Sequence, residues 1–146
     1  MPISSIALLL WLALCSRQDV RERQISNLLT LGVAACALVW LAVTGHSWIG
    51  ARASDAGWAL AIVLLLTLPG YAMGRFGAGD VKLLGALGLA TSQDYVLGTF
   101  IGAGGTLLVW ALLRRWARRR AGQGAEKQPF APFVLVGFLL TSMCLQ

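Results

Sequence analysis

The chain has 146 residues, of which 58% are hydrophobic and only 12% are charged, and its mean hydropathy is +0.73. Soluble domains carry roughly twice that charged fraction, and a 15.6 kDa globule could not bury this much apolar surface inside itself. The composition therefore excludes an ordinary soluble protein and predicts an integral membrane protein whose surroundings are the lipid bilayer.

The net charge of +6 could suggest a nucleic-acid partner, but the positions of the charges argue against one. Eleven of the twelve Lys and Arg residues lie in three short segments between apolar runs, which is the distribution that the positive-inside rule describes. The three cysteines, Cys15, Cys36 and Cys144, stand singly inside apolar runs. We therefore expect no nucleic acid, no metal site and no cofactor.

Six apolar segments predict an all-α fold, a six-helix transmembrane bundle that forms one domain over residues 1–146. The first segment has no basic residue before it and no small-x-small cleavage site after it, so we interpret it as a retained helix. Segment 83–92 is short and rich in glycine, and it is either a short span or a re-entrant helix. The expected helices cover about 3–23, 28–44, 57–74, 81–92, 95–113 and 132–145. A basic cytoplasmic loop at 114–128 is expected between the last two.

The basic residues also indicate the topology. If all six segments cross, only Arg52 falls on the side opposite to the other Lys and Arg residues. If segment 83–92 did not cross, the arginines of 114–120 would face away from those of 17–23. Six spans in the bacterial inner membrane, with both termini on the periplasmic side, are therefore favoured. In the fifth segment, Gly98, Gly102 and Gly105 recur at helical spacing and predict a face for close helix packing.

Two acidic residues at helix ends are candidates for catalysis. On this topology, Asp19 closes the first helix and Asp80 opens the fourth, both on the cytoplasmic side. Two carboxylates held close together share a proton and can act as base and acid on one water molecule. Each residue also has a simpler explanation, because Asp19 could pair with a nearby arginine and Asp80 could cap a helix. Glycines on both sides of Ala78 leave the backbone before Asp80 uncrowded.

Three motifs in order along the chain resemble those of one family. Asp19–Asn27, read DVRERQISN, resembles the D-x-x-x-R-x-I-P-N signature of prepilin peptidases. Phe76–Leu83 matches their G-x-G-D-V-K-L signature, and Pro129–Phe133 resembles the P-F-x-P-F entry to their last helix. A single G-x-G-D would be weak support, but the three motifs together span nearly the whole chain and fall on the correct sides of the membrane.

The resemblance implies an intramembrane aspartic endopeptidase (a hydrolase) that removes the basic leader of type IV prepilins, single-span membrane proteins, on the cytoplasmic side. Carried over to this chain, Asp19 and Asp80 would be the catalytic pair, with no cofactor. Supporting roles would fall to the other motif residues, which are Gly77, Gly79, Lys82, Arg23 and Asn27.

The chain departs from the family pattern in two places. Ser26 replaces the usual proline, and serine can cap the helix that follows. The ten residues 17–26 are all that separates the first two helices, whereas bifunctional members carry a four-cysteine loop there. The chain therefore resembles the short members that accompany tight-adherence or Flp pili, and we expect no N-methyltransferase activity.

A rival hypothesis is a non-enzymatic membrane subunit or small transporter that uses Asp19 and Asp80 as an ion or proton relay. This hypothesis predicts polar residues along a continuous path through the spans, and the helix centres contain almost none. An inactive homologue that serves as a scaffold also fits the sequence.

Overall fold

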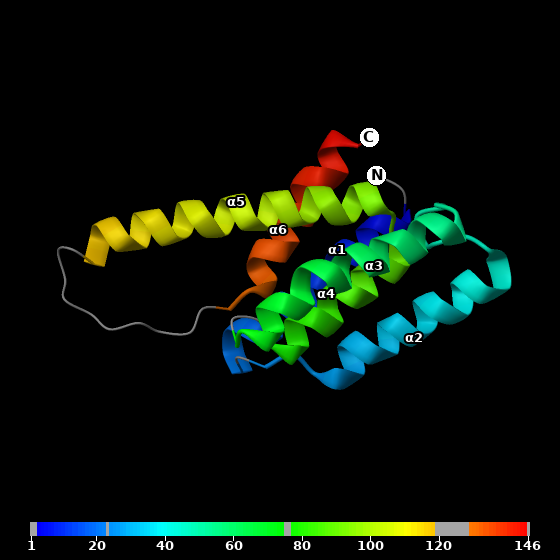
Figure 1. The fold of residues 1–146 in the computed structure, drawn as a ribbon, viewed down its shortest axis with the longest axis horizontal. Helices are drawn as coiled ribbons and strands as arrows, with labels where there is room; N and C mark the ends of the chain where they lie inside the picture. Colours follow the sequence, from blue (N-terminus) through cyan, green and yellow to red (C-terminus); the bar gives the residue numbers. More distant parts are fainter. Residues whose placement is uncertain (1–2, 23, 75–76, 119–128, 146) are drawn as a thin grey trace.

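The computed structural model describes residues 3–22, 24–74, 77–118 and 129–145. The only β-structure within these ranges is one isolated bridge between His46 and Arg52, so the predicted all-α fold is confirmed (Figure 1). The helices are α1 (Ile3–Glu22), α2 (Asn27–Thr44), α3 (Ala53–Ala72), α4 (Ala78–Ala90), α5 (Gln93–Arg118) and α6 (Ala131–Cys144).

Four of these helices are long and apolar enough to cross a membrane, namely α1, α2, α3 and the Gln93–Trp116 part of α5. Their outer faces expose large apolar side chains; Leu65 on α3 is 73% exposed and Ile101 on α5 is 76% exposed. Water would penalise such a surface, whereas the hydrocarbon core of a bilayer is as apolar as the side chains themselves. The chain is therefore a multi-pass membrane protein.

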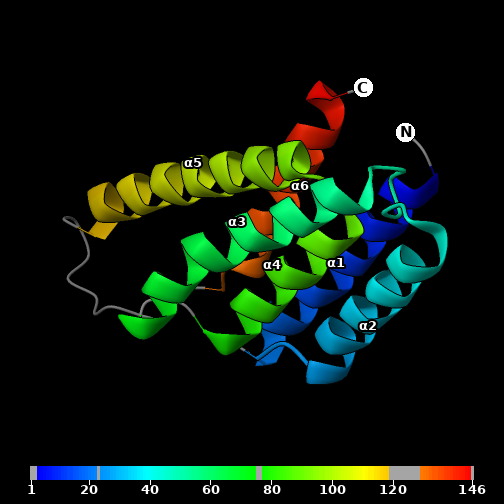
Figure 2. The same ribbon diagram turned by 45° about the vertical axis from the view of Figure 1, so that its right-hand side comes forward.

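The short helix α4 lies in the interior of the bundle, against α2 and α3. Six of its 13 residues are buried, and Gly88 allows the backbone of α3 to approach, since a Cβ there would lie 3.3 Å from the carbonyl carbon of Ala59. From its start near α2, α4 leads toward the end of the bundle where both chain termini lie (Figures 1 and 2). Its 13 residues rise only about 20 Å, which confirms the prediction that this segment is short.

Three helix boundaries differ from the prediction by three residues or more. Helix α5 continues to Arg118, so residues 114–118 belong to the helix and not to the basic loop, because Arg, Trp and Ala there are compatible with helix even where hydropathy ends. The rest of that predicted loop, 119–128, lies outside the described residues. Helix α3 begins at Ala53, with Asp55 in its first turn, where the helix dipole favours an acid. Helix α4 begins at Ala78, before Asp80.

The predicted glycine face on α5 is confirmed at two of its three positions. A Cβ on Gly102 would lie 2.7 Å from the Cα of Gly137, and one on Gly98 would meet the side chain of Thr141. These two glycines therefore allow α5 and α6 to pack at close range. At Gly105 the prediction is wrong, because an added Cβ would have nothing within 4 Å. The two helices have separated by that point.

Candidate active site

Asp19 lies near the C-terminal end of α1 and is 7% exposed. Its Oδ2 accepts a hydrogen bond of 3.0 Å from the backbone N–H of Ala131, the first residue of α6. The residue before it, Phe130, makes no side-chain cap, and the first N–H groups of a helix have no partner within the helix. Asp19 therefore caps α6 from a different helix.

Asp80 is the third residue of α4, and the helix cap is Gly77. Asp80 is therefore not the N-cap residue, and it contributes to the cap of α4 from the third helical position. Its Oδ2 accepts a 3.2 Å hydrogen bond from the N–H of Gly77, and its own N–H donates to the Gly77 carbonyl at 3.1 Å. This reciprocal pairing holds the carboxylate at the positive end of the α4 dipole.

Both carboxylates line one cavity of about 390 Å³. Its other walls come from the connection between α1 and α2 and from the start of α4. The complete lining is Asp19, Gln24, Ile25, Asn27, Gly77, Ala78, Gly79, Asp80 and Lys82. The backbone hydrogen bonds described above occupy only one oxygen of each carboxylate. A cavity of this size holds several water molecules or a short stretch of extended backbone.

The carboxyl group of Asp80 has a raised pKa. It stands in the first turn of α4, outside the four helices long enough to span a membrane. Burial raises its pKa to about 6, and the negative charge of Asp19 adds to the increase, while the hydrogen bond from Gly77 opposes it. Part of the increase thus comes from the other acid of the cavity, which is the behaviour expected of two neighbouring carboxylates.

Asn27 and Lys82 come together although 55 residues separate them in the chain. The Nζ of Lys82 donates a 2.8 Å hydrogen bond to Oδ1 of Asn27, so the bond joins the first residue of α2 to α4. The Ser26 side chain caps α2 by accepting from the N–H of Leu28 at 3.3 Å, which confirms the role predicted for serine at that position. Arg23, the remaining motif residue, lies outside the described residues.

The backbone conformation before Asp80 does not itself require glycine. Gly77 has a φ of −77° and Gly79 lies within α4, so neither requires the left-handed region that favours glycine. A Cβ on Gly77 would lie 3.3 Å from Oδ2 of Asp80, whereas one on Gly79 would lie 3.7 Å from the Cβ of Ile25, an ordinary contact. Gly77 therefore leaves room for the carboxylate of Asp80.

Two contributors to the site were missed from the sequence. Gln18 accepts a 3.1 Å hydrogen bond from the N–H of Ser26 through its side-chain carbonyl oxygen, which fixes the short connection between α1 and α2. Its place beside Asp19 was the only sign of this role. Ala131 contributes through its backbone, and a backbone donor leaves no trace in residue type. The available signal was that the predicted last helix begins without Ser, Thr, Asp or Asn at its cap, so its first N–H groups need a partner from elsewhere.

Comparison with known proteins shows the family of the chain. A model of the type IV leader peptidase family matches residues 6–112, a stretch that contains both aspartates and ends before α6. Searches of curated proteins and of solved structures gave no match. The matched stretch covers more than half of the 146 residues, and the family to which it points is one of membrane proteases. The chain therefore belongs to the type IV leader peptidase family.

Proposed function

We propose that this protease cleaves the basic leader from type IV prepilins of the Flp type, at the cytoplasmic face of the bacterial inner membrane. The observation that carries the proposal is the shared cavity of about 390 Å³, with Asp19 on one wall and Asp80 on another. The α1–α2 connection and the start of α4 that form this cavity belong to basic segments, which the positive-inside rule assigns to the cytoplasm.

The two carboxylates divide the chemistry between a base and an acid. Asp80, whose pKa burial raises to about 6, holds the proton at the start, and Asp19 acts as the base. Asp19 removes a proton from a water molecule as that water attacks the carbonyl carbon of the scissile peptide, while Asp80 protonates the carbonyl oxygen. Collapse of the tetrahedral intermediate then breaks the C–N bond, the amine leaves with the proton held by Asp19, and Asp80 regains its own.

The substrate is a prepilin whose helix lies in the bilayer and whose basic leader remains in the cytoplasm. Lys and Arg outnumber Asp and Glu in the segments assigned to the cytoplasmic face, so the charge of that face does not attract a basic leader. Recognition then depends on packing against the substrate helix and on a small residue, glycine, before the cleavage site. Because only the four residues 23–26 lie between the end of α1 and the start of α2, we expect leader cleavage without N-methylation.

A proton or ion relay through Asp19 and Asp80 remains the alternative activity, and the described helices give it little support. The buried hydroxyls of Thr67, Thr91 and Thr141 each donate to a carbonyl one turn earlier in their own helix. They therefore satisfy their own hydrogen bonds and do not form a chain of exchangeable protons through the bundle.

The proposal is tested by co-expression with a Flp-type prepilin and detection of leader removal by a shift in electrophoretic mobility. We expect Asp19→Asn and Asp80→Asn each to abolish cleavage, while the membrane level of the peptidase is unchanged. Asp94→Asn is the matched control, because Asp94 also stands in the first turn of a helix, α5, but does not line the cavity. If both cavity variants still process the prepilin, the proposed function is wrong.

A further inference from the structure

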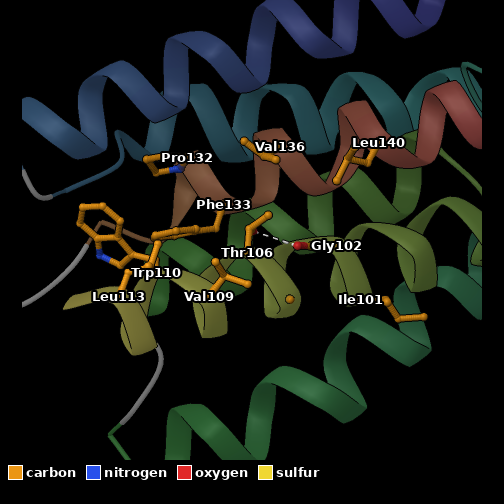
Figure 3. A pocket seen from close by; sticks show the side chains of 11 residues that line it. Ile101, Gly102, Thr106, Val109, Trp110, Leu113, Pro132, Phe133, Val136 and Leu140 are labelled. Atoms are coloured by element: carbon orange, nitrogen blue, oxygen red, sulfur yellow. Dashed lines mark hydrogen bonds between the residues drawn. The ribbon is translucent and has the colours of Figure 1, made fainter. Parts of the chain in front are cut away.

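An apolar groove of about 520 Å³ lies between α5 and α6 (Figure 3). Side chains from both helices form its walls, among them Val109, Trp110 and Leu113 from α5 and Phe133, Val136 and Leu140 from α6. The hydroxyl of Thr106 is also present, but it donates to the carbonyl of Gly102 at 2.8 Å, the dashed line in Figure 3. An apolar partner could therefore cover the groove, because the Thr106 hydroxyl already has its hydrogen bond.

The groove widens toward the end of the bundle that holds the candidate active site. The two helices are tightly packed where Gly98 and Gly102 meet α6, and they have parted at Gly105, where an added Cβ has nothing within 4 Å. In both overall views α5 and α6 diverge along the second half of α5 (Figures 1 and 2). On this half of α5, Val109 is 57% exposed and Leu113 is 60% exposed.

The groove is also continuous with the site through the first turn of α6. The N–H of Ala131 donates to Asp19, and the next two residues, Pro132 and Phe133, line the groove. One helical turn thus contacts the carboxylate on one side and the groove on the other. A helix lying in the groove against Pro132 and Phe133 would therefore pass within one turn of the Asp19–Ala131 bond.

We propose that this groove is the docking site for the transmembrane helix of the prepilin substrate. The inference rests on the proposed function, since a protease that cuts next to a membrane helix must hold that helix with its cytoplasmic end at the catalytic pair. Association of helices in a bilayer depends on close packing, for which an open glycine such as Gly105 is suited. The groove is lined by apolar side chains from both helices and by Gly102 and Gly105.

Two adjacent glycines give a matched test of the docking site. Gly104 and Gly105 are both exposed and both have open space at the Cβ position, but only Gly105 lines the groove. We expect Gly105→Leu to raise KM for a full-length prepilin by about tenfold or more, as loss of helix packing would, with kcat changed less than about twofold. Gly104→Leu should leave both constants unchanged. Equal constants for the two variants, or a loss confined to kcat, would overturn the proposal.

Photo-crosslinking identifies the occupant directly. A photoreactive amino acid replaces Val109 in the groove or, as a control, Leu65, an exposed residue of α3, in an Asp80→Asn background that retains uncleaved prepilin. We expect a crosslink to prepilin at Val109 and not at Leu65. A crosslink at Val109 to a second copy of the peptidase or to lipid alone, or a stronger prepilin crosslink at Leu65, would show that the groove does not hold the substrate helix.

The same experiments separate this inference from the proposed function. If the unmodified protein cleaves prepilin and loses that activity on substitution of Asp19 or Asp80, the proposed function stands whatever the groove variants do. Failure of the groove variants and of the crosslink alone then removes only the docking site. If the unmodified protein does not cleave prepilin, the function itself fails and the docking site fails with it.

Discussion

The carboxylate of Asp19 on α1 accepts a 3.0 Å hydrogen bond from the backbone N–H of Ala131, 112 residues further along the chain. One of the two acids in the cavity therefore also secures the start of α6. This helix has no side-chain cap of its own at Phe130, so loss of Asp19 would affect both the chemistry and the fold. A substitution at this position must be chosen so that the two effects can be separated.

Comparison of Asp19→Asn with Asp19→Ala separates them. The side-chain oxygen of asparagine can accept the same N–H, whereas alanine leaves that buried donor unsatisfied, at a cost of about 1–3 kcal/mol. We expect both variants to lose leader cleavage, but only Asp19→Ala to show a lower apparent unfolding temperature in detergent. Equal melting of the two variants would mean that the Asp19–Ala131 bond contributes nothing to stability.

Substitution of the glycines before Asp80 should show which of them the carboxylate needs. We expect Gly77→Ala to reduce cleavage strongly, because its Cβ would lie 3.3 Å from Oδ2 of Asp80 and would displace the carboxylate from the Gly77 N–H. Gly79→Ala should retain most activity, since its Cβ makes an ordinary 3.7 Å contact with Ile25 and alanine favours helix. Cleavage rates in matched membrane preparations measure the difference. A greater loss at Gly79 would indicate that the substrate, and not Asp80, requires the space.

The fold was predictable to the extent that hydropathy determines it. Six apolar segments predicted six helices, and the described part of the chain contains six in the expected order. Ser26 caps α2, as its residue type indicated. Helix ends were predicted less well, because hydropathy reports where apolar residues stop and helical hydrogen bonding continues past that point. Helix α5 accordingly runs to Arg118, five residues beyond the end expected at 113.

The candidate site was predictable in its side chains and not in its backbone contacts. Asp19 and Asp80 were identified from their charge in an apolar chain, and the structure places them on one cavity. The hydrogen bonds that orient them come from Ala131 and Gly77 through backbone N–H groups. Every residue except proline has such a group, so no residue type reveals it. Only the packing of α1 against α6 brings the first of these donors to Asp19.

The pH dependence of cleavage should follow the protonation of Asp80. Because its pKa is raised to about 6 and the proposed mechanism requires its protonated form, kcat should decline as the pH rises through 6, approaching about tenfold per unit well above it. Purified enzyme in detergent micelles with prepilin at saturating concentration gives the profile between pH 5 and about 8. The Asp94→Asn control should show the same profile as the unmodified protein. A kcat that stays constant or increases over this range would exclude Asp80 as the initial proton donor.

The hydrogen bond between Asn27 and Lys82 should position the start of α2 against α4 and take no part in proton transfer. We expect Asn27→Ala and Lys82→Met each to reduce cleavage only a few-fold, because an exposed hydrogen bond of this kind contributes about 1 kcal/mol or less. If the two side chains act through each other, the double variant should be no worse than either single one, a coupling that a double-mutant cycle on kcat/KM measures. Losses that multiply would show that the two residues act independently. A loss at Lys82 as large as that at Asp80 would place the ammonium group in the chemistry itself.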